Sequence, residues 1–344
     1  MYCKYRMKPT INDIARIAGV SKKTVSRVIN DSPLLTGETR DKVKAVIEQL
    51  GYVPNPQARA LALGHNFLIG LVHDNPNAQM ILNMQQGILE GLRGTEFAMV
   101  VQPVNRSSPS LVEDMREFIV RQRLYGIVIL PPISENDAVA KMCVEAGCRY
   151  VRMGSAVLDE SKHMVASNDR DAVKEAVRYL IQQGHKRIAI VTGPQGFRSA
   201  TERLAGFEDA MTEAGMKLPR SHRAEGEYTF DSGLVATEQL LDLSPRPTAI
   251  FASNDEMAAA VLYAARLRGI AVPDELSIVG FDDTPIASRI WPPLTTVRWP
   301  IVAMGRSAAH KLIAGAVEEI DLEDEPTEFL SNLIRRGSVA PPKP

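Results

Sequence analysis

The fold of the first part of the chain is decided by residues 10–30, which read TINDIARIAGVSKKTVSRVIN. Thr10 and Asp13 have the spacing of a capping box, in which each side chain satisfies a free backbone amide, so we expect a helix to begin at Ile11. Gly19 can turn the chain sharply because it has no Cβ. The apolar residues of this helix recur at helical spacing and predict a buried face of Ile14, Ala15, Ile17 and Ala18.

Two more helices are expected after this turn. Ser21 is a good N-cap for a helix from Lys22 to about Ile29, and Thr36 is one for a helix over residues 37–50. The inward-facing residues of the two helices are Val25, Val28, Ile29, Val43, Val46, Ile47 and Leu50. The other face of the second helix carries Lys22, Lys23, Thr24, Ser26 and Arg27.

Short helices joined by a tight turn indicate a helix-turn-helix, whose second helix fits the major groove of DNA. The charge distribution agrees, because residues 1–64 contain 11 Lys or Arg against 5 Asp or Glu, a net +6, whereas the other 280 residues carry −7. A basic head on an acidic body suggests that only the head meets a polyanion. The alternative is a plain three-helix bundle with a solvated charged face, and the complete pattern favours the DNA-binding fold.

Residues 10–30 resemble the amino-terminal signature of the lactose-repressor (LacI/GalR) family of transcriptional regulators. The resemblance implies a DNA-binding domain over residues 1–55 that recognises double-stranded operator DNA. The residues that it implies in DNA contact, including those of the following linker, are Thr10, Ser21, Lys22, Lys23, Thr24, Ser26, Arg27, Asn30, Thr36, Arg40, Tyr52, Asn55, Ala58, Arg59 and Leu61.

A candidate switch occupies residues 56–65, where Pro56 suits the first position of a short helix. Isolated helices below ~12–15 residues are marginal in water, so we expect this one to be ordered only against a partner. The resemblance implies a hinge helix that pairs with its dimer mate in the minor groove, with Leu61 as a wedge in a base step. The alternative is an ordinary linker helix docked on the body, with Leu61 in its core.

From about Asn66 the apolar pattern changes to short runs of strand length, separated by helical patterns. The runs cover residues 67–72, 97–101, 126–130, 187–191, 248–252 and 276–280. The helical patterns lie around 79–93, 110–123, 170–183, 200–214, 232–242 and 255–268. This alternation predicts an α/β fold with buried parallel sheets, which bind ligands at the carboxyl ends of their strands.

The family resemblance continues to about residue 338, through motifs such as Gly193-Pro194, Ser253-Asn254-Asp255 and Gly280-Phe281-Asp282-Asp283-Thr284. It implies an effector-binding and dimerisation body over 66–338, with two doubly wound α/β subdomains of the periplasmic-binding-protein type and a cleft between them. The implied N-subdomain is about 66–165 plus 299–328, and the C-subdomain is about 166–298 plus 329–338. No heptad pattern follows, so a homodimer is the default expectation.

Several polar residues fall just after predicted strands, where a ligand in the cleft would lie; they are Asp74, Asn75, Asn254 and Asp282. By resemblance, Asn254 and Asp282 hold positions that hydrogen-bond a sugar effector. A carboxylate with an amide suits vicinal hydroxyls, because together they offer acceptors and donors.

The arginine of the site is harder to assign. Thr201 aligns with the effector arginine of the lactose-repressor pattern, so Arg198, three residues earlier, is the predicted effector contact, and Arg203 is given a structural role. Trp299 stands where relatives often carry glutamine, and either stacks on a sugar face or packs against Pro300. Asp169 resembles a common acidic position where the chain crosses between lobes.

Other features favour neither an enzyme nor a secreted protein. Asp282 and Asp283 could suggest a catalytic pair, but adjacent strand-end residues point apart. Cys143 and Cys148 lack the further ligands of a metal site, and the sequence carries no phosphate loop, so no metal or cofactor is expected. A low, odd number of cysteines, no signal peptide and no apolar run of 18 residues predict a cytoplasmic protein.

We therefore expect a sequence-specific transcriptional regulator, in the simplest case a repressor, that binds a palindromic operator as a dimer. A small molecule in the cleft, with a sugar favoured, would control it. The alternatives are a solute-binding protein, a corepressor-dependent regulator with a non-sugar effector, and an enzyme on a doubly wound fold.

Overall fold

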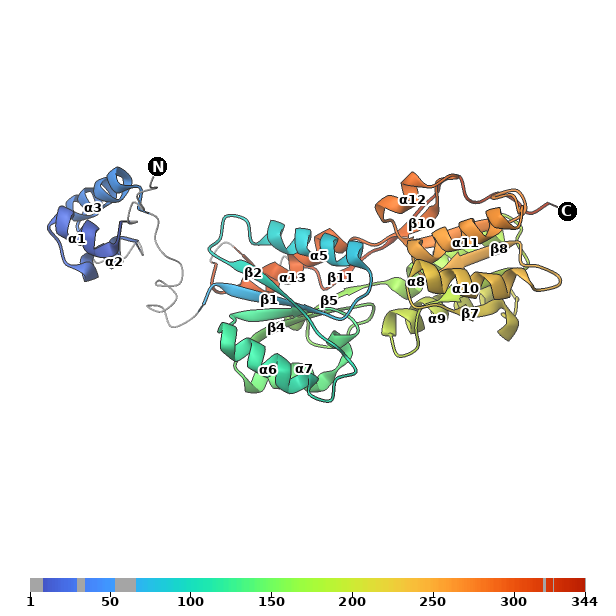
Figure 1. Cartoon of the computed structure of the whole chain (residues 1–344), viewed down its shortest axis with the longest axis horizontal. Helices are drawn as coiled ribbons and strands as arrows, with labels where there is room; N and C mark the ends of the chain where they lie inside the picture. The colour runs from blue at the N-terminus through green and yellow to red at the C-terminus, as the bar shows by residue number, and fades with distance from the viewer. Residues whose placement is uncertain (1–8, 30–34, 53–65, 318–319, 324, 344) are drawn as a thin grey trace, which may run out of the picture. The chain divides into compact units, whose positions relative to one another are not determined.

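The computed structural model describes residues 9–29, 35–52, 66–317, 320–323 and 325–343. The chain forms two compact units, Met1–Phe67 and Leu68–Pro344, which we call the head and the body (Figure 1). Within the described ranges, no helix is both long and apolar enough to span a bilayer.

The head contains the predicted helices α1 (Ile11–Ala18), α2 (Lys22–Ile29) and α3 (Gly37–Leu50). The Asp13 carboxylate accepts hydrogen bonds from the backbone N–H of Thr10 at 3.0 Å and from its hydroxyl at 2.7 Å, which lowers the pKa of Asp13. Gly19 ends α1 with a φ of 62°, and the Ser21 hydroxyl accepts from the N–H of Thr24 at 3.1 Å. The local signals in the sequence therefore set both ends of the helix-turn-helix.

Two expectations for the head were wrong in detail. Thr36 precedes α3, but its hydroxyl pairs with that of Thr39 at 3.0 Å and caps no backbone amide. Ile17 was expected in the buried face, yet 49% of it is exposed. The face of α1 that packs inward is centred on Ile14 and Ala18, and at 100° per residue Ile17 lies beside that face.

The body is built on two six-stranded sheets (Figure 1). The first has the order β11-β5-β4-β3-β1-β2, from the strands β1 (Leu68–His73), β2 (Ala98–Pro103), β3 (Gly126–Ile129), β4 (Arg149–Gly154), β5 (Met164–Ser167) and β11 (Glu328–Phe329). The second has the order β12-β10-β9-β8-β6-β7, from β6 (Ile188–Thr192), β7 (Arg223–Glu225), β8 (Ala249–Ala252), β9 (Ser277–Asp282), β10 (Thr295–Arg298) and β12 (Asn332–Ile334). All neighbouring strands pair in parallel except β12, which is antiparallel to β10.

Helices cover both sheets. In the first lobe, α5 (Ala78–Gly91) and α13 (Ile301–Ile313) pack together on one face, and α6 (Leu111–Gln122) and α7 (Asp137–Glu145) lie on the other (Figure 1). In the second lobe, α8 (Asp169–Gln182) packs on α9 (Arg198–Glu213), and α10 (Phe230–Leu241) packs on α11 (Asp255–Leu267). The short α12 spans Pro285–Arg289. The expected α/β class with two doubly wound lobes is confirmed.

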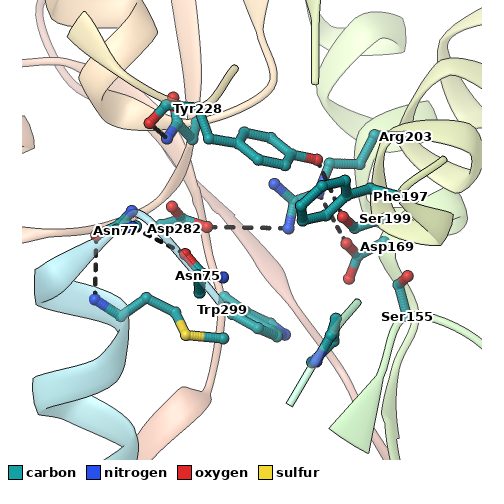
Figure 2. A pocket seen from close by; sticks show the side chains of 13 residues that line it. Asn75, Asn77, Ser155, Asp169, Phe197, Ser199, Arg203, Tyr228, Asp282 and Trp299 are labelled. Carbon is teal, nitrogen blue, oxygen red and sulfur yellow. Dashed lines mark hydrogen bonds and ion pairs between the residues drawn. The ribbon is translucent and has the colours of Figure 1, made fainter. Parts of the chain in front are cut away.

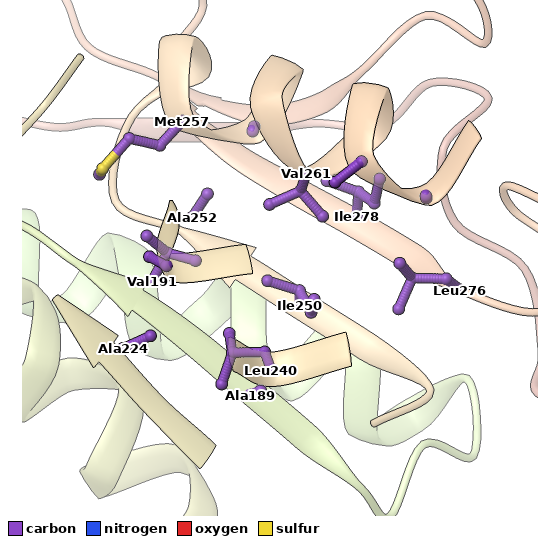
Figure 3. Close-up of a cluster of buried hydrophobic side chains, with 14 of the residues drawn as sticks. Ala189, Val191, Ala224, Leu240, Ile250, Ala252, Met257, Val261, Leu276 and Ile278 are labelled. Atoms are coloured by element: carbon purple, nitrogen blue, oxygen red, sulfur yellow. The ribbon is translucent and has the colours of Figure 1, made fainter. Parts of the chain in front are cut away.

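The core of the second lobe shows why the sequences of these strands are continuous apolar runs. Ile250 and Ile278 lie on neighbouring strands and are fully buried beneath Val261 of α11 (Figure 3). Strands covered by helices on both faces have no solvent side, so their sequences do not alternate. The six predicted runs each match a strand within two residues, whereas β4, β5, β7, β10, β11 and β12 were not predicted as strands.

The chain crosses between the lobes at three places, which follow β5, β10 and β11. The carboxyl ends of both parallel sheets therefore face the crossing region. In each sheet the chain reverses its order at one strand, β1 in the first and β6 in the second, and ligands of doubly wound folds bind at such points.

In each lobe a glycine allows two helices to approach very closely; these are Gly87 of α5, against α13, and Gly206 of α9, against α8. A Cβ on Gly206 of α9 would lie 2.1 Å from the carbonyl oxygen of Arg170 in α8. Gly206→Ala is therefore expected to destabilise the body by about 1–3 kcal/mol, the usual cost of overpacking. Urea denaturation measures this, with Gly154→Ala as control because its added methyl meets the flexible end of Met164 at 3.1 Å. Equal stability of the two variants would contradict the prediction.

Candidate functional site

A pocket opens between the lobes, and most of its lining residues follow the carboxyl ends of strands of both sheets (Figure 2). From the first lobe come Asn75, Asn77, Met80, Pro131 and Ser155, and from the second lobe and the crossing segments come Asp169, Phe197, Ser199, Arg203, Tyr228, Asn254, Asp282 and Trp299. A polar pocket at this edge of two parallel sheets is the position expected for a small ligand.

The electrostatic centre of the pocket is Arg203, which is only 4% exposed. Its guanidinium donates to the Asp169 carboxylate at 2.8 Å and to the carbonyl of Ser253 at 2.5 Å, and lies 3.9 Å from the carboxylate of Asp282. Its carbon also lies 3.6 Å from the ring centroid of Phe281, a cation–π arrangement. Burial alone would lower the pKa of Arg203, but the carboxylates of Asp169 and Asp282 hold it above its usual value.

Asp282 ends β9 with a φ of 107°, an unusual backbone conformation for a residue other than glycine. Burial raises the pKa of Asp282 well above its usual value, and the nearby Arg203 only partly offsets this effect. Strained backbone at a buried carboxylate is a feature of functional sites.

Asp283 also has a positive φ, 55°, but its carboxylate serves another purpose. It accepts from Arg298 and from Arg336, each at 2.6 Å, and does not line the pocket. The prediction that the two adjacent carboxylates point apart is confirmed. Asp283 therefore fastens the end of β10 and the carboxyl-terminal segment to the strand that carries Asp282.

The two predicted amides of the pocket are partly used by the protein itself. The side-chain oxygen of Asn254 caps α11 by accepting from the N–H of Met257 at 2.9 Å, and its nitrogen donates to the carbonyl of Tyr228 at 2.9 Å. The oxygen of Asn75 accepts from the N–H of Asn77 at 2.8 Å. Asn254 thus keeps one N–H for a ligand, because its amide carries two.

An aromatic wall closes the second-lobe side of the pocket. Tyr228 and Phe197 meet edge to face with their centroids 5.8 Å apart, and the Tyr228 hydroxyl lies 3.0 Å from that of Ser199. Gly193 must be glycine here, because a Cβ would lie 2.3 Å from the Tyr228 ring. Burial raises the pKa of Tyr228, so the phenol stays neutral and can donate a hydrogen bond.

Trp299 lines the pocket and also packs against the apolar core of the second lobe. Its indole N–H is buried, as is the hydroxyl of Ser155, and neither has a hydrogen-bond partner among the described residues. Buried polar atoms normally find a partner in protein, water or ligand. Both side chains line the pocket (Figure 2).

Three residues predicted from the sequence do not line the pocket. Asp74 instead accepts from the backbone N–H of Arg106 at 2.9 Å. Arg198 is the first residue of α9, and its side chain turns to Glu202 at 3.3 Å. Thr201 bonds the carbonyl of Phe197 at 3.3 Å. Arg203 reaches the pocket and Arg198 does not, because five residues along α9 carry Arg203 round to the face that packs on Asp169.

In the head, α2 leaves Lys22 and Lys23 exposed and Thr24, Ser26 and Arg27 partly exposed, as predicted for a face that meets DNA. Thr10 and Ser21 serve as caps at the starts of α1 and α2, Thr36 directly precedes α3, Arg40 lies in α3, and Tyr52 packs against the apolar core of the head. The remaining predicted contacts lie outside the described residues; they are Asn30, Asn55, Ala58, Arg59 and Leu61.

Neither cysteine of the body is suited to redox chemistry or metal binding. Cys143 and Cys148 are buried, and burial raises the pKa of each thiol to about 12. In the part of the chain that the structure describes, no three His, Cys, Asp or Glu side chains cluster so that they could hold a metal ion.

Comparison with known proteins identifies both parts of the chain. Residues 10–55 match the family of bacterial regulatory proteins named lacI, and residues 177–339 match the periplasmic binding protein-like domain. The transcriptional regulator CelR of Thermobifida fusca is 35% identical over 318 residues, which cover 90% of this chain and 92% of CelR.

Two solved structures resemble the whole chain. A CelR–cellobiose complex matches with a TM-score of 0.69 and 31% identity over 96% of this chain and 99% of CelR. The lac repressor dimer bound to operator and the anti-inducer ONPF matches with a TM-score of 0.80 and 26% identity over 96% of this chain and 99% of that one. These relatives are transcriptional regulators and not enzymes. The chain, with its helix-turn-helix head and two-lobed body, therefore belongs to the LacI family of DNA-binding transcriptional regulators.

Proposed function

We propose that the protein is a repressor that binds a palindromic operator as a homodimer and responds to a neutral sugar held between the lobes of its body. The pocket carries this proposal. Its polar groups offer both donors and acceptors at the carboxyl ends of two parallel sheets, and two of them, the Trp299 N–H and the Ser155 hydroxyl, have no hydrogen-bond partner in the described part of the chain.

The charges of the pocket favour a neutral ligand over an anion. The single positive charge of Arg203 is already offset by Asp169 and faces Asp282 as well. A sugar phosphate or a carboxylate would meet two aspartates and no free cation among the described lining residues. Sugar hydroxyls, in contrast, both donate to carboxylates and accept from N–H groups. The CelR complex with cellobiose supports this ligand class.

The proposed roles follow from position. Asp282, Arg203, Asn254 and Asn75 hydrogen-bond the sugar, and Trp299 covers one side of it. Arg203 is proposed as the effector contact in place of Arg198 and Thr201, whose side chains bond elsewhere in α9 and its N-cap. Asp74 is proposed to hold the loop that contains Arg106.

For DNA we propose a head over residues 1–55, a hinge over 56–65 and a body over 66–338, with the two subdomains divided as predicted from the sequence. Arg27 and the lysines of α2 enter the major groove, and the hinge residues Ala58, Arg59 and Leu61 enter the minor groove. We place the protein in the cytoplasm, where the operator is.

A thermal-shift screen of the full chain tests the effector. Cellobiose, ribose, glucose, glucose 6-phosphate and glucuronate are compared, so that neutral sugars stand against anions of similar size. A ligand at ~100 times its Kd adds about 2.7 kcal/mol to the free energy of unfolding. Stabilisation by an anion but by no neutral sugar would refute the proposed ligand class. A gel shift on the promoter of the gene itself then reports whether the ligand releases DNA.

The DNA-binding surface is tested by Arg27→Ala. Arg27 lies partly exposed on the predicted DNA face of α2, so we expect operator affinity to fall by about 1–3 kcal/mol if it reads a base. Fluorescence anisotropy at fixed salt measures this. Arg121→Ala, which removes a largely exposed arginine of α6 in the body, is the control and should leave operator affinity unchanged. An unchanged affinity of Arg27→Ala would remove this residue from the interface.

A further inference from the structure

The start of α9 is held by a residue of the other lobe. Glu135 ends the short 3₁₀ turn Ile133–Glu135 that follows β3 of the first sheet. Both of its carboxylate oxygens accept from the backbone N–H of Arg198, at 3.1 and 3.2 Å. Arg198 is the first residue of α9 in the second lobe, so a carboxylate lies at the positive end of this helix. The contact joins the two lobes directly, next to Phe197 of the pocket lining.

A second contact between the lobes lies one residue away. The guanidinium carbon of Arg106, in the loop after β2, lies 4.3 Å from the ring centroid of Phe197. The loop is itself tied to the first lobe, because the backbone N–H of Arg106 donates to Asp74. Phe197 is 3% exposed and lies between Arg106 of the first lobe and Tyr228 of the second. Its ring is therefore a pocket wall supported from both lobes.

Both contacts depend on the distance between the lobes. Glu135 and Arg106 belong to the first lobe, whereas Phe197 and Arg198 belong to the second. If the lobes separate, the N–H of Arg198 and the face of the Phe197 ring lose these partners together. Phe197 holds the N-cap position of α9, but its side chain cannot accept a hydrogen bond from the first turn of the helix. Glu135 of the first lobe accepts that hydrogen bond instead.

We propose that Glu135 and Arg106 are positioning residues that place Phe197 in the pocket wall only when the cleft is closed. Closing the cleft and completing the binding site are then a single event, and a ligand that favours the closed cleft also gains these two contacts. This inference rests on the proposed effector site. It adds that Glu135 and Arg106, which do not line the pocket, couple ligand binding to the angle between the lobes.

The chain offers a direct readout of cleft closure without a ligand. It has two tryptophans, of which Trp291 is 81% exposed and Trp299 lines the pocket. In a Trp291→Phe background, the emission of Trp299 reports exposure of the pocket to water. Acrylamide quenching is compared for this parent and for Glu135→Ala, Arg106→Ala and Glu135→Gln. The control is Glu145→Ala, which removes a glutamate paired with Arg116 within the first lobe.

Loss of the charge-assisted hydrogen bond of Glu135 is expected to shift the ratio of closed to open cleft about tenfold, and loss of the cation–π contact of Arg106 about two- to fivefold. Glu135→Ala and Arg106→Ala should therefore red-shift the Trp299 emission and raise its quenching constant. Glu135→Gln keeps an acceptor and should fall between Glu135→Ala and the parent, and Glu145→Ala should match the parent. Parent-like quenching in both alanine variants would overturn the proposal.

Two further measurements keep the test decisive. Far-UV circular dichroism and melting temperature identify a variant that fails to fold. If Glu135→Ala does so, Arg106→Ala decides the outcome, because Arg106 is exposed and lies in a loop. A cellobiose titration of the parent is recorded separately. Its failure would count against the sugar effector, whereas the quenching result in the absence of ligand would still decide the coupling.

Discussion

Replacing Arg203 by methionine is expected to lower the free energy of unfolding of the body by about 3–5 kcal/mol, the usual effect of removing one partner of a buried ion pair. Asp169 is completely buried and Asp282 nearly so, and Arg203 is the cation that faces both among the described residues. The variant leaves two carboxylates without a counter-charge. It also removes the stacking of the guanidinium on Phe281.

The pH dependence of this variant has a definite sign. In this variant the carboxylate of Asp282 loses its nearby cation and binds protons more readily in the folded state, so its folded pKa rises further above the unfolded value. The variant should therefore be less destabilised at mildly acidic pH and lose stability as the pH rises. Urea denaturation between pH 5 and 8 measures both effects.

The double variant Arg203→Met with Asp169→Asn provides the matched control. It removes both partners of the closest pair, and replacing both partners of a buried ion pair is often nearly neutral. We expect it to recover most of the lost stability and still fail to bind the effector. If Arg203→Met alone unfolds like the parent protein, the ion pair is not a structural element, and Arg203 acts only toward the ligand.

An element could be predicted from the sequence when the residues that determine it lie close together along the chain. The helix-turn-helix could be predicted because its signals, the capping box at Thr10, the turn at Gly19 and the cap at Ser21, act within a few residues. The same holds for strands such as β3 and β8, whose residues are all buried and apolar.

Elements that depend on distant partners could not be predicted in this way. The strand β4 contains Arg149 and Arg152, so it does not form an apolar run. Arg152 is nevertheless buried, because Asp137, Asp159 and the carbonyl of Ser134 surround it. The pattern of residue types along the chain does not show which distant residues will pair with Arg152.

The place of Arg203 in the pocket lining could not be predicted for a similar reason. The predicted helix began at residue 200, whereas α9 begins at Arg198, so the phase of its faces was not known. What brings Arg203 inside is Asp169, 34 residues earlier in α8. Only the packing of α8 against α9, made possible by the close approach at Gly206, selects the second arginine.

The replacement Asp282→Asn is expected to separate ligand binding from stability, with opposite signs. Asparagine keeps the size of the side chain and tolerates the positive φ of 107°. It loses the charge and one acceptor, and a hydrogen bond to a charged group contributes about 1.5–3 kcal/mol. Affinity for the sugar found in the thermal-shift screen should therefore fall by roughly 10- to 150-fold, with operator binding unchanged. Isothermal titration calorimetry and a gel shift measure the two.

Stability should change in the other direction, because the folded protein disfavours the ionised form of Asp282. Burial raises the folded pKa of Asp282 well above the unfolded value of ~3.9, so its contribution to stability is complete below that value and is lost as the pH rises through the folded pKa. Asparagine does not titrate, so the variant lacks this loss. It should be more stable than the parent by about 0.5–2 kcal/mol at neutral pH, a gain typical of replacing a functional group held at a cost to stability.

The difference in stability between Asp282→Asn and the parent should therefore grow with pH from about 4 upward. Asp255, whose pKa burial raises to about 7, is present in both proteins, and its charge is one of the causes that raise the pKa of Asp282, so the difference includes this interaction. Asp274→Asn is the control, because Asp274 is exposed and pairs only with Lys343 among the described residues. If Asp282→Asn binds the sugar like the parent and is no more stable at any pH, then Asp282 neither contacts the ligand nor carries a buried charge, and the proposed centre of the pocket is wrong.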